Sequence, residues 1–205
     1  MTPDSASTRL PRFAAYLAAL PGGLAAYPDC IAKGALIRTT VDDQPGLVSR
    51  AAELPRELAR LLLDPPLAGE WLPEAHFVAL FHAHNDLLGL DEVGVQARSR
   101  ERNRLLFESP AYRILMAVLS PATLLRFAGK RWENFHRGTR LEVSGASDDG
   151  VRAVLRFPRN LFDRLVLLAY GQSFAAALEL SGAREPVVHL ERVEPESGHF
   201  RVVWG

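Results

Sequence analysis

The densest group of side chains that could do chemistry lies between residues 74 and 86. Glu74, His82 and Asp86 are separated by multiples of four residues, so on an α-helix they share one face. Carboxylate and imidazole groups bind divalent metals, and this set could supply three ligands. The rings of His82 and His84 would point about 200° apart on a helix and could not chelate from one side. We expect no functional metal here, because a solvated helix face with His84 in the apolar stripe is the simpler interpretation.

Candidates for nucleophilic catalysis are isolated in the sequence. No Gly-x-Ser-x-Gly segment is present, and Cys30 is the single cysteine. Cys30 follows Asp29 near a possible helix N-terminus, which could lower its pKa, but a small buried hydrophobe is the favoured interpretation. One cysteine excludes an internal disulfide and a multi-cysteine metal site, which indicates a reducing compartment. We therefore expect neither catalytic residues nor a cofactor.

A run of arginines could form a phosphate or nucleic-acid patch, but its context argues against this. The run comprises Arg98, Arg100, Arg102 and Arg104. Only alternate members share a helical face, and Glu92, Glu101 and Glu108 are interleaved with them. This pattern favours a solvated helix with ion pairs.

Composition indicates an ordinary globular chain. Of its 205 residues 48% are hydrophobic, and 24 basic residues balance 24 acidic ones, so the formal net charge is zero. This balance removes the attraction that dominates binding to nucleic acids and anionic membranes. The segment Met1–Ala6 has no basic residue, and the apolar run Phe13–Leu20 is too short to span a bilayer. We expect a cytoplasmic protein with no nucleic-acid partner, no membrane insertion and a single domain over residues 1–205.

The first part of the chain, about residues 8–137, is predicted to be helical. Apolar spacing, proline and glycine punctuation and capping residues predict helices over these segments: residues 13–20, a helix from Asp29 to about residue 42, 55–63, an amphipathic helix over 74–88, 91–107, about 110–119, and 121–135 ending at His136-Arg137-Gly138. Ser109-Pro110 and Ser120-Pro121 each place serine at an N-cap and proline at the first helical position.

The remainder, residues 138–205, changes to an alternating pattern. Residues 139–143 and 151–157 predict a hairpin around a polar turn, and residues 187–193 and 200–204 predict two further strands. Between them, Asn160 or Asp163 could cap a long buried helix over 161–181 that contains the small-residue patch Gly171–Ala177. The predicted fold class is α+β: an N-terminal helical half packed with a C-terminal four-stranded antiparallel sheet in strand-strand-helix-strand-strand order.

Several segments together resemble a known family. They are Tyr27-Pro28, Trp71-Leu72-Pro73-Glu74, Tyr112-Arg113, Ser120-Pro121, Trp132-Glu133-Asn134-Phe135, Gly182-Ala183-Arg184 and Phe200-Arg201-Val202-Val203-Trp204. In these segments the chain resembles an uncharacterised myxobacterial-type family of about this length, which is similar in layout to the heme–nitric-oxide-binding and 4-vinyl reductase-like superfamily. The resemblance implies either a cavity for heme or another hydrophobic small molecule, or a dimeric assembly module.

The resemblance does not extend to the heme ligands. Heme-binding members hold the propionates with a Tyr-x-Ser-x-Arg segment at the end of the second strand, and a histidine on the preceding helix ligates iron. Here residues 156–160 read Arg-Phe-Pro-Arg-Asn, and Leu124 and Leu125 stand near the helical position. His136 is the nearest histidine, and at the end of a helix its protonated ring would favour the helix dipole.

These observations predict a non-enzymatic module that binds an apolar small molecule or acts as a sensor, without heme. The candidate ligand-binding residues are the aromatic side chains Phe81, Tyr112, Trp132 and Phe174. Two alternatives stay open. One is a ligand-free homodimeric or adaptor module, which close packing of Gly171–Ala177 would favour; the other is an enzyme, which would need a cleft joining Glu74, His82 and Asp86.

Overall fold

The computed structural model describes residues 10–42, 45–108, 120–147 and 150–205. The chain divides into two compact units. Unit 1 comprises residues 1–90 and 134–138, and unit 2 comprises residues 91–133 and 139–205. The chain thus leaves unit 2, contributes five residues to unit 1 and returns. That the whole chain behaves as a single domain stays a prediction.

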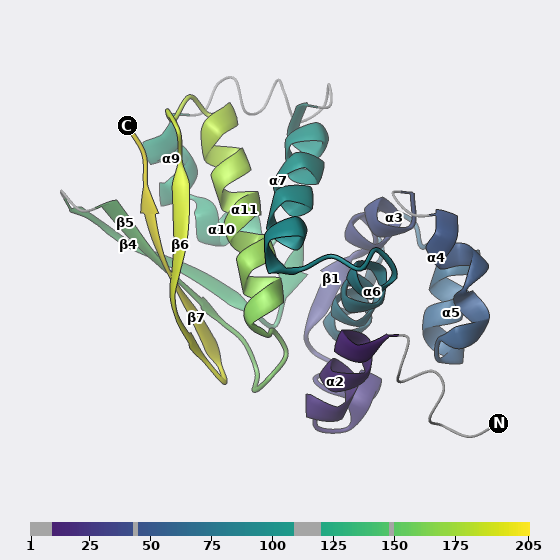
Figure 1. Cartoon of the computed structure of the whole chain (residues 1–205). Helices are drawn as coiled ribbons and strands as arrows, with labels where there is room; N and C mark the ends of the chain where they lie inside the picture. The colour runs from purple at the N-terminus through teal and green to yellow at the C-terminus, as the bar shows by residue number, and fades with distance from the viewer. Residues whose placement is uncertain (1–9, 43–44, 109–119, 148–149) are drawn as a thin grey trace. The chain divides into compact units, whose positions relative to one another are not determined.

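Unit 1 is built around helix α6 (Glu74–Leu87), which α2, α3, α4 and β1 contact (Figure 1). Its other helices are α2 (Pro11–Ala19), η1 (Gly23–Ala25), α3 (Gly34–Asp42), α4 (Pro45–Ser49), η2 (Ala51–Glu53) and α5 (Arg56–Leu63). From Glu74 to Asn85 every α6 residue except His76 is buried. The predicted helix is confirmed, but the prediction of a solvated face is wrong, because neighbouring elements cover α6 on all sides.

A small antiparallel sheet completes unit 1. Its strands β1 (Ile31–Lys33), β2 (Trp71–Pro73) and β3 (His136–Arg137) lie in the order β2-β1-β3. The predicted helix therefore begins at Gly34 rather than at Asp29, and His136 lies in a strand rather than at a helix end. Strands of two or three residues are too short to show alternation, so pairing between distant segments determined them.

Unit 2 contains the predicted four-stranded antiparallel sheet. Strands β4 (Arg140–Ser147), β5 (Gly150–Arg156), β6 (Val187–Glu194) and β7 (Ser197–Val203) lie in the order β4-β5-β7-β6. Helix α11 (Arg164–Leu180) follows β5, which confirms the strand-strand-helix-strand-strand order, and it begins where the Asp163 carboxylate accepts the Val166 N–H at 3.0 Å. The helix lies between the sheet and α7 (Glu92–Glu108), as Figure 1 shows.

The segment before β4 is two short helices rather than one long helix. These are α9 (Pro121–Arg126), whose predicted cap is confirmed because Ser120 Oγ accepts the Thr123 N–H, and α10 (Ala128–Trp132). A Cβ at Gly129 would lie 2.7 Å from the Leu141 carbonyl oxygen, so this glycine lets α10 approach β4 closely. The helix predicted over about 110–119 lies outside the described residues.

The core of unit 2 is apolar. Phe200 and Val202 of β7 and Leu155 of β5 are almost fully buried, as is Leu167 of α11. Alternation along β7 turns Arg201 to the opposite, solvated face, where its Nε donates to Glu191 at 2.8 Å. In the described parts of both units, none of the helices has the length and apolar character needed to cross a membrane.

Candidate functional site

The three potential metal ligands on α6 do not converge. Described residues contain no group of three or more His, Cys, Asp or Glu side chains able to hold a metal. Asp86 Oδ2 accepts the backbone N–H groups of Arg12 and Phe13 at 2.9 and 3.0 Å. These are the second and third residues of α2, so Asp86 caps that helix from a distant part of the sequence.

The two histidines of the predicted cluster are buried. The His82 ring is 1% exposed and lies 5.1 Å from the ring of Tyr16 and 5.4 Å from that of Phe81, measured between centroids. His84 is 4% exposed, as expected for a residue in the apolar stripe. Half-buried His76 carries a pKa below its ordinary value because burial disfavours its charged form.

A buried carboxylate–imidazole pair lies at the start of α6. His136 Nδ1 contacts both Glu74 carboxylate oxygens at 3.0 and 3.1 Å, and Glu74 is fully buried. The Glu74 N–H donates to the Cys30 carbonyl oxygen at 2.8 Å, which places this pair beside β1. A carboxylate bonded to Nδ1 fixes the orientation of the ring. The pair therefore holds β3 in the small sheet.

Cys30 adjoins this pair, and its surroundings disfavour a reactive thiolate. Its Sγ lies 3.4 Å from the Gly138 carbonyl oxygen, and burial, followed by the nearby charges of Glu74 and Asp29, raises its pKa to about 11. The interpretation of Cys30 as a small buried residue is confirmed, and a lowered pKa is not found. Gly138 has φ of +77°, and a Cβ there would lie 2.8 Å from the Cys30 Sγ, so only glycine fits this approach.

The predicted ligand-binding residues fall into different places. Trp132 and Phe174 come together in unit 2, with ring centroids 6.3 Å apart, whereas Phe81 belongs to α6 of unit 1. Tyr112 lies outside the described residues. The Trp132 indole N–H donates to Thr139 Oγ1 at 2.9 Å, and its ring meets Tyr170 edge-on at 5.0 Å.

Further aromatic rings extend this cluster in unit 2. Phe174 meets Phe200 edge-on at 5.5 Å, and Tyr170 meets Phe162 at 5.2 Å. Half-buried Phe174 is thus one member of a group of rings joining α11 to the sheet. Such edge-to-face contacts fix ring positions more firmly than buried area alone.

The small-residue patch packs closely against the sheet. A Cβ added at Gly171 would lie 3.4 Å from Val188 Cγ1 and 3.7 Å from Phe200 Cε1, which are ordinary contact distances. Ala175 and Ala176 are each 1% exposed. The sheet therefore lies at ordinary contact distance from this position, and an alanine would also fit there.

The position implied for the iron ligand is apolar, and the segment implied for the propionates differs from the heme-binding pattern. Leu124 of α9 packs in a cluster with Val151, Leu178 and Val202. Phe157, which follows β5, is 5% exposed, and its ring meets the Phe162 ring in a tilted arrangement with 5.0 Å between centroids. Neither side chain offers a lone pair for iron. The donors in the segment that follows β5 do not reproduce the Tyr-x-Ser-x-Arg pattern, and Arg156 Nε donates to Glu142 at 3.1 Å. His136 uses Nδ1 on Glu74, as described above.

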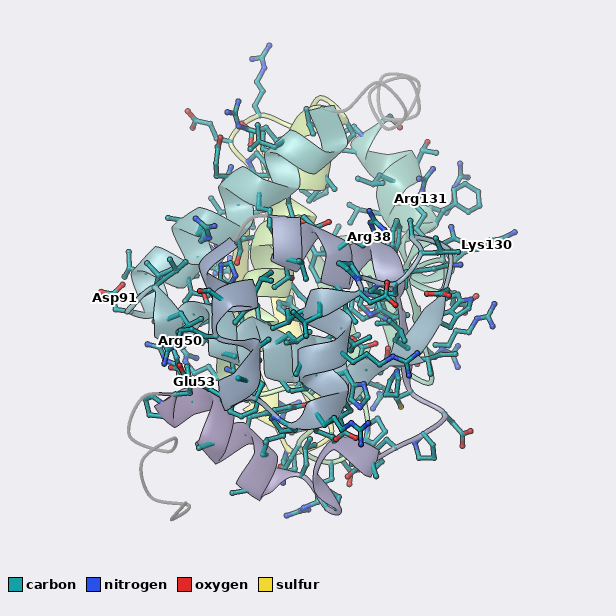
Figure 2. The ribbon with its side chains drawn as sticks, turned by 90° about the vertical axis from the view of Figure 1, so that its right-hand side faces the viewer. Arg38, Arg50, Glu53, Asp91, Lys130 and Arg131 are labelled. Carbon is teal, nitrogen blue, oxygen red and sulfur yellow. The ribbon has the colours of Figure 1, made fainter. Side chains whose placement is uncertain are left out.

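The arginines of α7 form the expected ion pairs. Arg104 contacts Glu101 at 3.0 Å within the helix, and Arg100 contacts Glu179 of α11 at 3.1 Å. A half-buried pair joins Arg50 to Glu53 at 2.6 Å in unit 1, and Figure 2 shows the two residues side by side. Exposed pairs such as those of α7 add little to stability.

Comparison with solved structures identifies the fold. The chain resembles a structure described as "Probing the function of heme distortion in the H-NOX family", with a TM-score of 0.59, 12% identity and coverage of 84% of this chain and 94% of that one. An Fe(II) unliganded H-NOX protein from K. algicida matches with a TM-score of 0.58 at 12% identity, covering 84% and 96%. An oxygen-binding H-NOX domain related to soluble guanylate cyclases matches at 0.56 and 13%, covering 83% and 92%.

No protein-family model matches the chain, and no curated protein matches it. At this level of identity the structural likeness defines an H-NOX-like α+β fold. The expected similarity in layout to the heme–nitric-oxide-binding superfamily is confirmed for the fold.

Two features of unit 1 were not singled out as functional from the sequence. The Glu74–His136 pair joins residues far apart in the chain, so no local pattern marks it. Trp71 was noted only within the resemblance, yet Lys33 Nζ lies 4.2 Å and Arg137 Cζ 4.0 Å from the centroid of its ring. No sequence signal could have found this grouping without the strand register.

Proposed function

We propose that this protein is a non-enzymatic sensor module that binds a small apolar molecule without heme. The observation that carries the proposal is the H-NOX-like fold across 84% of the chain. The compared structures include one described as oxygen binding and one described through its heme, so this fold is used elsewhere to hold small ligands. Membership of the myxobacterial-type family and a cytoplasmic location stay predictions.

Ligand binding without heme is supported by the side chains at the implied ligand positions. Leu124 is buried among apolar neighbours and cannot coordinate iron, and residues 156–160 have arginine, proline and asparagine in place of the tyrosine, serine and arginine of the propionate-binding pattern. The described residues do not fit heme held in the way that the resemblance implies. An apolar molecule needs no such ligands, because burial of its surface provides the affinity.

The ligand would contact the aromatic cluster of unit 2. Trp132 and Phe174 belong to this cluster, and Phe174 is only half-buried, so part of its ring is open to a ligand. Trp132 is anchored by its bond to Thr139 and would form a rigid wall. Phe81 and Tyr112 stay candidate ligand-binding residues outside this cluster.

The first test is native mass spectrometry of protein purified without a histidine tag, with extraction of any molecule that co-purifies. We expect a stoichiometric apolar adduct. The neutral fluorescent probe N-phenyl-1-naphthylamine then tests the site: Phe174→Ala should weaken binding at least fivefold, because an aromatic contact is lost. Leu105→Ala, at an exposed position of α7, is the matched control and should leave binding unchanged. Absence of both an adduct and saturable probe binding would overturn the proposal.

A second candidate is a ligand-free homodimeric or adaptor module. The packing of α11 on the sheet at Gly171, where an added Cβ would meet Val188 Cγ1 at the ordinary contact distance of 3.4 Å, favours it. The same mass spectrum separates the candidates, since this alternative requires a clean dimer, or a monomer that captures a partner, with no adduct.

A further inference from the structure

The small sheet of unit 1 presents one face on which cationic and aromatic side chains gather. Lys33 of β1 lies opposite Trp71 of β2, and Ile31 lies opposite Arg137 of β3. Because side chains alternate along a strand, Lys33, Trp71 and Arg137 share one face, whereas Ala32 and His136 occupy the other, buried face. Arg137 is exposed and the other two are half-buried, so this face is open to a ligand.

Two cations lie against a single ring on this face. Lys33 Nζ is 4.2 Å and Arg137 Cζ 4.0 Å from the centroid of the Trp71 ring, so at most about 8 Å separates them. Their mutual repulsion is not relieved by a carboxylate, because neither forms an ion pair with any acidic side chain in the described ranges. The adjacent acid, Glu70, turns its Oε2 to the Leu67 N–H at 2.8 Å instead.

The side chains on this face carry more hydrogen-bond donors than the described residues use. Lys33 Nζ uses one donor on the Gly69 carbonyl oxygen at 3.1 Å. Among the residues that the structure describes, the Arg137 guanidinium and the Trp71 indole N–H donate to none. A guanidinium offers a fork of donors that matches the oxygens of a phosphoryl group, and an ammonium adds a point charge.

We propose that Lys33, Trp71 and Arg137 form a binding site for a phosphoryl group, carried by a small phosphomonoester or by free phosphate. A phosphoryl group has several oxygens and up to two negative charges, so it can contact both cations together. The indole ring holds the two cations in place and supplies a further N–H. This site lies in unit 1 and is independent of the apolar ligand proposed for unit 2.

The test follows the indole N–H resonances of 15N-labelled full-length protein, with the Trp71 signal assigned from Trp71→Phe. Sodium phosphate and methyl phosphate are titrated separately, with sodium chloride at matched ionic strength as the reference. We expect saturable movement of the Trp71 signal with the phosphates alone. Tighter binding of methyl phosphate would indicate a phosphomonoester ligand, and tighter binding of inorganic phosphate would indicate free phosphate. Either result supports the site.

Variants then test the assigned cations. Arg137→Gln should weaken phosphate binding at least tenfold and Lys33→Gln several-fold, because each loses a charge-assisted contact. Arg126→Gln is the matched control, since this exposed arginine lies 5.2 Å from the Phe127 ring in unit 2 and should not alter binding. Thermal unfolding verifies that each variant folds. Equal movement with chloride, non-saturable movement, or an equal loss in Arg126→Gln would overturn the proposal, whereas binding of the neutral probe should be unaffected throughout.

Discussion

The two units bury different chemistry at their centres. In unit 1 the central helix buries Glu74, His82, His84 and Asn85, while in unit 2 the space between α11 and the sheet is filled by Phe162, Phe200 and aliphatic side chains. Apolar burial is non-directional, whereas a buried polar group requires a specific partner. Unit 1 therefore specifies which distant segments meet, and unit 2 gains stability mainly from the area it buries.

Phe200→Ala should have the largest effect and should be independent of pH. Phe200 is 1% exposed and meets the Phe174 ring, so its removal leaves a cavity that costs about 3–5 kcal/mol. Urea unfolding at pH 5.5 and 7.5 measures the loss. A loss that differs by more than about 1 kcal/mol between the two pH values would break the contrast between the units.

Glu74→Gln should cost about 1–3 kcal/mol, because it removes the carboxylate that bonds the buried His136 ring and keeps the shape of the side chain. The same urea experiment measures it, with Glu101→Gln as the exposed control that loses only a surface ion pair and should leave stability nearly unchanged. Equal effects of the two substitutions would mean that the buried pair contributes no more than a surface pair.

Asp86→Ala should cost about 1–2 kcal/mol, because two N–H groups at the start of α2 lose their acceptor. Hydrogen exchange should locate the loss in the first turn of α2 and leave β4–β7 unaffected. A uniform increase in exchange across both units would show instead that Asp86 acts on the fold as a whole.

The smallest effect concerns Cys30, whose folded-state pKa of about 11 exceeds the ordinary thiol value. The folded protein thus holds this proton more tightly than the unfolded chain, and the associated stability is complete below about pH 9 and declines as pH rises towards 11. The wild-type protein should lose more stability over this range than Cys30→Ala, as measured by urea unfolding. Parallel pH profiles of the two proteins would refute this.

Sequence periodicity predicted the elements whose pattern is long enough to read. Helix α11 and strands β4 to β7 were predicted within a few residues, because a long apolar helix and alternating strands carry their own signal. Strands β1 to β3 were missed, since His136-Arg137-Gly138 also has the composition of a helix end. Only pairing with β1 distinguishes the two.

The candidate site was less predictable than the fold. Helical spacing correctly aligned Glu74, His82 and Asp86, but their partners come from other elements: Glu74 contacts His136, and Asp86 contacts α2. Spacing along one helix predicts which side chains share a face, but it does not predict which other elements cover that face. Trp132 and Phe174 were both named as aromatic candidates, and their contact depends on the packing of α10 and α11. Their role in ligand binding stays a prediction.

The brief return of residues 134–138 to unit 1 has a consequence for synthesis on the ribosome. When the chain has been made through Leu90, the residues of α6, β1 and β2 are present. One edge of β1 still lacks its partner strand β3, and Glu74 still lacks His136. The small sheet closes only after translation has passed Gly138, by which time α7, α9 and α10 have also been made. Nascent protein therefore exposes an unpaired strand edge for the time taken to make this stretch, which is the period when a chaperone would have most to protect.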